Sequence, residues 1–182
     1  MPIGLLSDTH GNLSLMHAAA EQLAGRLSAE VLVHLGDDFE DGEELSVWGL
    51  PVLRVPGLYC PAYHDEDVPR VLFKEVEGRS VAFVHREEDL SPEERGACSV
   101  LAVGHTHRYV FRSESQPLVV NPGHLKASIH RGQPPSFGLL EVTGTGMRFT
   151  VHGLGGEVLL EGERRWRDDG EVKSQIPNPN LQ

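Results

Sequence analysis

Four short apolar segments of this chain each end within two residues of an aspartate or histidine. Residues 3–6 lead into Asp8 and His10, residues 31–35 into Asp37, residues 81–84 into His85, and residues 100–103 into His105 and His107. Apolar runs of this length are typical of strands buried inside a sheet. Because ligands of α/β sheets bind outside the carboxyl ends of parallel strands, we expect these polar side chains to converge on one site.

The first half of the chain alternates strand-like and helix-like segments. Apolar residues recur at helical spacing from Leu13 to Leu27, behind Asn12 as a plausible N-cap. Residues 41–49 are expected to form a short helix that stops at Gly49, before a third strand at 52–55. Such alternation indicates a parallel α/β sheet.

The second half is richer in strands. Residues 71–76 and 81–84 are joined by a hairpin-like connection, and Ser91 caps a single helical turn. Further strands are expected at 109–112, 117–120, 137–142, 147–152 and 157–161, and we interpret this half as antiparallel. The prediction is one α/β domain of residues 1–163 with two facing sheets, followed by a polar, mobile tail at 164–182.

Composition narrows the classes of function. The 182 residues carry a net charge of −11, which disfavours general nucleic-acid binding because that affinity comes from clustered Lys and Arg. No apolar run approaches the roughly 20 residues that span a bilayer, so no membrane association is expected. The start of the chain shows no signal-peptide pattern, and two cysteines make no disulfide framework, so we expect a cytoplasmic protein.

The residue types at the strand ends are those of a metal site. Two carboxylates and four imidazoles suit Zn, Fe, Mn, Co or Ni better than Ca or Mg alone. In the Asp-x-His and His-x-His pairs, alternate residues of an extended segment point to the same side. Gly36 and Gly104 leave room where backbone passes close to the site.

These motifs resemble those of a known family. The segments "SDTHGN", "HLGDD", "PG" after the third strand, "VHRE", "GHTH" and "NPG" occur in this order. They resemble the calcineurin-like metallophosphoesterases, most closely the small, single-domain bacterial and archaeal phosphodiesterases that share the fold of the retromer subunit Vps29. The resemblance extends from Pro2 to about residue 160 and covers nearly the whole domain.

The resemblance implies a four-layer α/β-β/α sandwich of two facing sheets flanked by helices, with two divalent transition metals. By this resemblance, Asp8, His10 and His107 are ligands of the first metal, Asp37 bridges both metals, and His85 and His105 are ligands of the second. It further implies hydrolysis of a phosphodiester or phosphomonoester by a metal-bound hydroxide held at Asp37, without an assigned side-chain acid or base. Manganese is the expected metal, with Zn, Fe, Co or Ni as alternatives.

The sequence departs from the family pattern in three motifs. Leu58 stands where the family has a metal-binding Asn, Arg86-Glu87 replaces Gly-His, and His124 replaces Ser. We therefore expect a second metal site that is weak or empty. The candidate replacement ligands or substrate-side residues are His124, Arg86, Cys60 and Asn12.

Two main functions remain open, and a third, regulatory nucleotide binding at a single metal, is intermediate between them. The first is an enzyme that acts on a small phosphorylated substrate. The second is a catalytically weak or inactive scaffold that retains metal and binds a protein partner, as Vps29 does. Leu58 and the altered His-Gly-His motif favour the second, whereas the six retained ligand positions favour the first.

Overall fold

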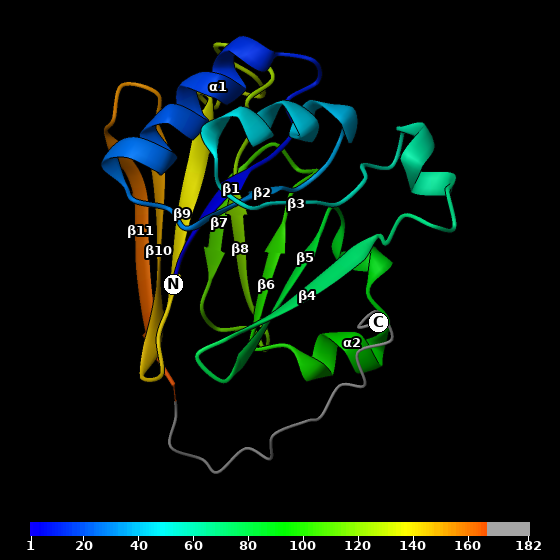
Figure 1. The fold of residues 1–182 in the computed structure, drawn as a ribbon. Coiled ribbons are helices and arrows are strands. Elements are labelled where there is room, and N and C mark those ends of the chain that lie inside the picture. Colours follow the sequence, from blue (N-terminus) through cyan, green and yellow to red (C-terminus); the bar gives the residue numbers. More distant parts are fainter. Residues whose placement is uncertain (167–182) are drawn as a thin grey trace.

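The computed structural model describes residues 1–166 and contains two sheets that face each other (Figure 1). The six-stranded sheet has the order β11 (Val158–Arg165), β10 (Gly146–Gly153), β9 (Ser136–Val142), β1 (Pro2–Leu6), β2 (Val31–His34) and β3 (Val52–Arg54). The five-stranded sheet has the order β4 (Val71–Val76), β5 (Arg79–Val84), β6 (Val100–Val103), β8 (Leu118–Pro122) and β7 (Tyr109–Arg112). Side chains of both sheets, such as Leu5, Phe83 and Phe149, fill the core between them.

Strand direction decides where the loops gather. β1, β2 and β3 pair in parallel, as the alternation predicts. The antiparallel interpretation of the second half is wrong for β5, β6 and β8, because β6 pairs in parallel with both β5 and β8. The reason is that β7 runs back along the sheet edge, antiparallel to β8, so that β8 enters between β7 and β6. The carboxyl ends of β5, β6 and β8 therefore lie at one edge of their sheet.

One helical layer covers the outer face of the six-stranded sheet (Figure 1). Helix α1 (Leu13–Glu21) continues into a π-helical turn, η1 (Gln22–Arg26), and is followed by a 3-10 helix, η2 (Glu40–Trp48). Asn12 caps α1, since its side chain accepts a hydrogen bond from the Leu15 N–H at 3.3 Å. Gly49 ends η2 with a left-handed φ of 71°. Leu23 and Leu45 belong to the buried cluster on this outer face.

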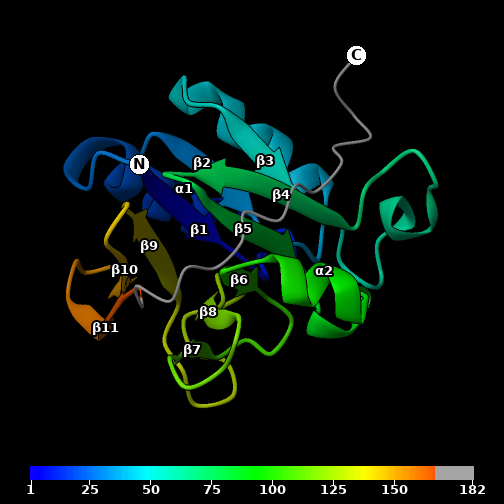
Figure 2. The ribbon, with the colours of Figure 1, turned by 90° about the horizontal axis from the view of Figure 1, so that it is seen from below.

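The outer face of the five-stranded sheet has a thinner helical layer. It comprises η4 (Glu87–Asp89) and α2 (Pro92–Ala97), while η3 (Pro61–His64) lies in the connection before β4. Ser91 and Glu94 form a capping box at α2, so the predicted helical turn is confirmed. Figure 2 shows α2 beside β5 and β6, on the side away from β1–β3. The arrangement is thus the predicted sandwich of two sheets between helical layers.

β4 and β5 form the predicted hairpin through Glu77 and Gly78, whose φ values of 51° and 75° are both positive. β11 continues through Arg165, beyond residue 163, and the Trp166 indole N–H donates to the Thr143 carbonyl at 2.8 Å. The rest of the expected tail lies outside the described residues. Within residues 1–166, no helix combines the length and apolarity needed to cross a membrane.

Candidate metal centre

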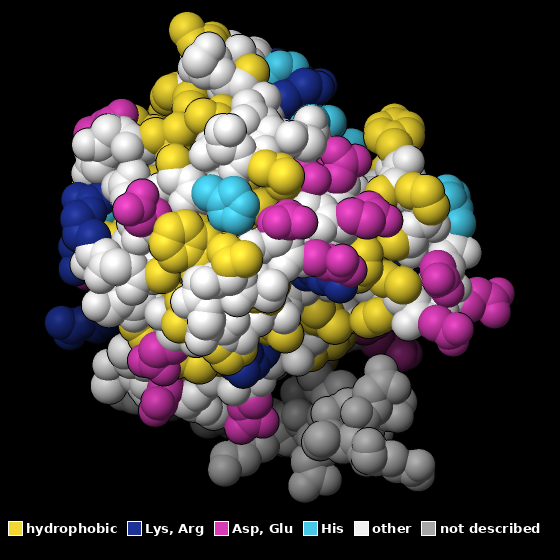
Figure 3. Space-filling model, turned by 45° about the horizontal axis from the view of Figure 1, so that its top comes forward, with side chains coloured by type: hydrophobic (Ala, Val, Ile, Leu, Met, Phe, Trp, Pro, Cys, Tyr) yellow, Lys and Arg dark blue, Asp and Glu magenta, His cyan; other side chains and the backbone are white. Residues whose placement is uncertain are grey.

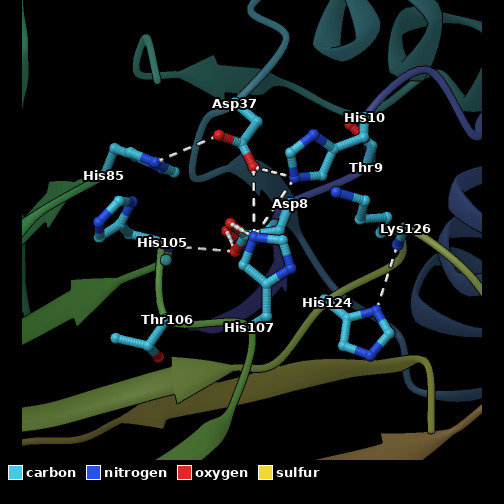
Figure 4. Close-up of polar contacts among 12 residues, drawn as sticks. Asp8, Thr9, His10, Asp37, His85, His105, Thr106, His107, His124 and Lys126 are labelled. Atoms are coloured by element: carbon cyan, nitrogen blue, oxygen red, sulfur yellow. Dashed lines mark hydrogen bonds and ion pairs between the residues drawn. The ribbon is translucent and has the colours of Figure 1, made fainter. Parts of the chain in front are cut away.

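The loops after β1, β2 and β6 bring four predicted ligands together (Figure 4). Asp8, His10, Asp37 and His107 each offer one ligand atom, and these atoms all lie within 4.8 Å of one another. Three of the four residues are buried, and His10 is exposed at the mouth of the cluster. The strand-end pattern therefore predicts the members of a real cluster, drawn from segments nearly 100 residues apart.

Asp37 lies between two groups of imidazoles. Its Oδ2 lies 2.7 Å from His10 Nε2 and 3.7 Å from His107 Nε2. Its Oδ1 lies 3.4 Å from His85 Nε2 on the other side. The two oxygens of one carboxylate thus face different histidines, which is the arrangement required of a ligand shared by two cations.

Asp8 is held by its neighbours. Its Oδ2 accepts hydrogen bonds from the Ser7 hydroxyl at 2.6 Å and from the His105 backbone N–H at 3.1 Å. Its Oδ1 is left without a hydrogen-bond donor and lies 3.2 Å from His107 Nε2. One oxygen is therefore used for orientation, while the other faces the cluster.

His85 and His105 lie on the far side of Asp37. Their ring centres are 5.1 Å apart, and the ring planes are inclined at 72°. The His85 Nδ1–H donates to the Leu35 carbonyl at 2.7 Å, which leaves Nε2 as the nitrogen aimed at Asp37. Such an outer hydrogen bond selects the tautomer of a ligating histidine. The structure thus brings all six predicted residues into one region, four of them in the tight cluster.

Backbone strain is concentrated at these residues. Among residues 1–166, eight non-glycine residues have positive φ, and five of them are Asp8, His10, Asp37, His105 and His107. Non-glycine residues seldom adopt this region, and such strain persists where surrounding structure holds it, often at functional sites. The backbone conformation thus singles out five of the six predicted ligands, independently of their side-chain distances.

Glycines permit the close approach of the loops. A Cβ on Gly57 would lie 2.2 Å from the Asp37 Cα, and one on Gly36 would lie 2.6 Å from His85 Nδ1. A Cβ on Gly104 would lie 2.1 Å from the Ser7 hydroxyl, next to Asp8. The expectation for Gly36 and Gly104 is confirmed, and Gly57 has the same role on the third strand's loop.

The electrostatics of the cluster favour a cation. Burial, followed by the charge of Asp37, raises the pKa of Asp8 well above its ordinary value. Burial would also raise the pKa of Asp37, but its contact with Asp8 and the nearby histidines outweigh burial and lower it. Burial lowers the pKa of His85, and it lowers that of His107 to about 3. Neutral imidazoles are the form that binds metal.

Buried polar atoms of the cluster also suit a bound metal ion. Asp8 Oδ1, Asp37 Oδ2 and His85 Nε2 are buried, and none of them makes a hydrogen bond of normal geometry within residues 1–166. Buried polar groups normally have one, so these atoms need an occupant that accepts their lone pairs. A donor set of carboxylate oxygens and imidazole nitrogens fits a divalent transition metal.

The candidate residues His124 and Cys60 form hydrogen bonds with groups outside the cluster. The Lys126 N–H donates to His124 Nδ1 at 3.3 Å, and His124 Nε2 donates to the Gln133 carbonyl at 3.2 Å, so neither nitrogen faces the cluster. Cys60 is buried, and its thiol donates to the Gly57 carbonyl at 3.1 Å. These two side chains have local structural partners in the described arrangement.

Arg86 and Asn12 also have structural partners. The Arg86 guanidinium pairs with Asp89 at 2.8 Å and donates to the Tyr63 hydroxyl at 3.0 Å, which ties η3 to η4. The Asn12 side chain caps α1 and donates to the Lys126 carbonyl at 3.0 Å. Leu58 itself is half-buried, directly after the glycine that packs on Asp37.

Sequence reasoning missed two features. His130, in the loop between β8 and β9, has its ring centre 4.6 Å from that of His107. Asp41 accepts hydrogen bonds from the Thr9 hydroxyl at 2.6 Å and from the Gly11 N–H at 2.8 Å, on either side of His10. His130 follows no strand, and Asp41 resembles any other acidic residue of an exposed helix. The pattern of polar residues after strands therefore could not have identified His130 or Asp41.

Comparison with known structures supports the architecture. YfcE, a phosphoesterase from E. coli, matches with a TM-score of 0.70 and 22% identity over 89% of this chain and 98% of that chain. A novel archaeal phosphodiesterase matches with a TM-score of 0.63 and 21% identity over 91% and 100%. Vps29 from Entamoeba histolytica, complexed with Zn²⁺, matches with a TM-score of 0.64 and 15% identity over 91% and 99%. At these identities the likeness shows the fold.

The family follows from the sequence match. No curated protein sequence gives a significant match. The model of the calcineurin-like phosphoesterase superfamily domain, however, matches residues 1–145, which include every residue of the cluster. This chain therefore belongs to the calcineurin-like phosphoesterase superfamily.

Proposed function

We propose that this protein is a metal-dependent phosphoesterase that hydrolyses a small phosphodiester or phosphomonoester. The observation that carries the proposal is the position of Asp37, whose two oxygens face His10 and His85 at 2.7 and 3.4 Å. A carboxylate shared in this way is what a pair of cations requires. Asp8, His10, Asp37 and His107 would hold the first cation, and Asp37, His85 and His105 the second.

The bound cations would supply Lewis-acid stabilisation of the phosphate and a lowered pKa for water, with manganese the expected metal. The chain's residues set the geometry. Ser7 and the His105 N–H fix one oxygen of Asp8, and Leu35 fixes the tautomer of His85. Exposed His10 is on the side that a phosphate ester would approach. Two free, buried cysteines fit a reducing compartment such as the cytoplasm.

The second metal site is proposed to be the weaker one. Its remaining protein ligands would be Asp37, His85 and His105, while Leu58 offers no donor atom. Three protein ligands still suffice for a catalytic metal with an open position. We therefore expect a high-affinity first site and a low-affinity second site.

A second function is a protein-binding scaffold that retains metal. It is supported by Leu58 and by the adjacent Tyr59, which is 84% exposed after the third strand. The solved Vps29 with Zn²⁺ means that metal binding alone does not separate the two functions. Turnover does separate them.

The test is hydrolysis of bis(p-nitrophenyl) phosphate and p-nitrophenyl phosphate by the purified protein with Mn(II). We expect turnover that is lost in Asp37→Asn and in His107→Ala and kept in His64→Ala, an exposed histidine of η3. Absence of turnover with Mn(II), Zn(II), Fe(II), Co(II) or Ni(II), in a folded protein that binds the metal, would reject the enzyme and favour the scaffold.

A further inference from the structure

The loop between β8 and β9 contains a short hairpin beside the metal centre. His130 and Gln133 exchange backbone hydrogen bonds of 3.0 and 2.9 Å, and Arg131 and Gly132 between them have φ values of 50° and 75°. Positive φ at both central residues is the geometry of a tight two-residue hairpin turn. His124 donates to the Gln133 carbonyl at 3.2 Å and so ties the hairpin to the loop base. The turn presents its side chains from a defined backbone.

The hairpin places donors on the solvent side of the cluster. The His130 ring centre lies 4.6 Å from that of His107. Arg131 donates from Nη1 to the Thr106 carbonyl at 3.2 Å, between His105 and His107. In Figure 4, the Lys126 side chain extends toward His10. The side chains of Lys126, His130 and Arg131 therefore lie beside the residues proposed to bind the first metal.

Within residues 1–166, no carboxylate forms an ion pair with Lys126 or Arg131. The chain carries a net charge of −11, so unpaired cations beside its metal centre are not explained by a general excess of positive charge. In Figure 3, histidine and Lys or Arg side chains adjoin at the top of the molecule, whereas acidic side chains are scattered over the face below.

The function of these cations follows from the charge balance. Metal cations would neutralise Asp8 and Asp37, so Lys126 and Arg131 are not needed to balance those carboxylates. The remaining guanidinium N–H groups of Arg131 match the paired oxygens of a phosphate or carboxylate. An anion held by them would lie beside the scissile phosphate rather than on the metals.

We propose that Lys126, His130 and Arg131 bind a second anionic group of the substrate, next to the phosphate that is hydrolysed. The substrate class is thus a phosphate ester with a further phosphate or carboxylate nearby. This inference rests on the proposed function and assigns the three residues to substrate selection. His130 contributes an N–H donor, and the other two contribute charge.

The test uses two substrates that differ by one phosphate. They are the p-nitrophenyl ester of thymidine 5′-phosphate and the same ester carrying a 3′-phosphate. We expect the Mn(II)-loaded protein to have a KM about tenfold lower for the ester with the 3′-phosphate, since a charge-assisted hydrogen bond contributes roughly that factor or more. The preference should shrink as salt is raised, because exposed charges are screened.

Substitutions then show which residues cause the lower KM for the ester with the 3′-phosphate. Lys126→Ala, Arg131→Ala and the double variant should remove the KM difference between the two esters. Arg131→Ala also removes the hydrogen bond to the Thr106 carbonyl, whereas Lys126→Ala tests the anion site without that change. Arg148→Ala, an exposed arginine of β10 paired with Glu161, is the matched control and should keep the preference.

Binding without turnover gives a second readout. Calorimetry should show tighter binding of thymidine 3′,5′-bisphosphate than of thymidine 5′-phosphate, and the double variant should lose the difference. Equal KM values for the two esters, or a preference that survives in the double variant, would overturn this inference alone. If neither ester is hydrolysed but the bisphosphate still binds more tightly, the proposed hydrolysis fails and the anion site stands.

Discussion

His10 and His107 point their Nε2 atoms at each other across 3.3 Å, although 97 residues separate them in the chain. Each nitrogen also lies near a carboxylate oxygen, at 2.7 Å from Asp37 for His10 and at 3.2 Å from Asp8 for His107. Convergence of two imidazoles and two carboxylates is the arrangement of ligands around a shared cation.

Metal should stabilise the fold, and Asp37 should be required for the effect. A ligand that binds only the folded state adds about 2.7 kcal/mol at 100 times its Kd. For a chain of this size, that corresponds to a rise in Tm of roughly 5–10 °C. We expect Mn(II) to produce this rise in the wild type and in His64→Ala, but not in Asp37→Asn. Thermal unfolding with and without metal measures it, and an equal rise in Asp37→Asn would remove Asp37 from the ligand set.

His34 should make the metal-free protein less stable in acid. It is fully buried, and burial lowers its pKa from 6.5 to about 4. Since the folded pKa is below the unfolded one, its contribution to stability is present above pH 6.5 and is lost as pH falls toward 4. At about 1.4 kcal/mol per pKa unit, the loss approaches roughly 3 kcal/mol.

The measurement is urea unfolding of metal-free protein between pH 4 and 7.5. The free energy of unfolding of His34→Gln should fall less across this range than that of the wild type, whereas His64→Gln should follow the wild type. The raised pKa of Asp8 acts in the opposite sense, with stability lost as pH rises. Comparison of variants at each pH separates His34 from this background. Parallel curves for His34→Gln and wild type would contradict the prediction.

Asp41 should position the Asp8–His10 turn. It accepts hydrogen bonds from Thr9 and Gly11, and the His34 Nε2–H contacts the same Thr9 hydroxyl at 3.1 Å. Outer-shell partners typically contribute about 10–100-fold to metal affinity. We expect Asp41→Asn to weaken Mn(II) binding by that factor, measured by calorimetry, while circular dichroism shows an unchanged fold. Glu40→Gln, its exposed neighbour, is the control; an unaltered Mn(II) affinity in Asp41→Asn would show that the turn holds without it.

Leu58 should limit the second metal site. It follows Gly57, which lies against the Asp37 backbone, so an amide at residue 58 starts close to the carboxylate that both metals would share. Leu58→Asn should raise the affinity for a second Mn(II) about tenfold and bring the metal content closer to two per chain. Elemental analysis and calorimetry measure it, with Tyr59→Asn as the control. Unchanged stoichiometry and affinity would mean that residue 58 does not restrict this site.

Local signals in the amino-acid sequence account for the helices and strands of this protein and for the identity of the central cluster. Apolar runs, caps such as Asn12 and Ser91, and the stop at Gly49 are local signals, and parallel strands carry their end residues to one edge. Asp8, Asp37 and His107 could therefore be predicted before any contact was known. Local pattern also located the hairpin of β4 and β5.

The order in which the strands combine, and which side chains remain available, depend on contacts that form only in the folded chain. β8 enters the sheet parallel to β6 because of the path of β7, and no local period encodes that order. His124 and Arg86 have candidate chemistry in the sequence, but Gln133, Lys126 and Asp89 occupy their polar atoms. His130 reaches His107 only through a tight turn in a loop. Such roles depend on partners distant in sequence, and a hydrogen bond or ring contact exists only once the chain has folded around both of them.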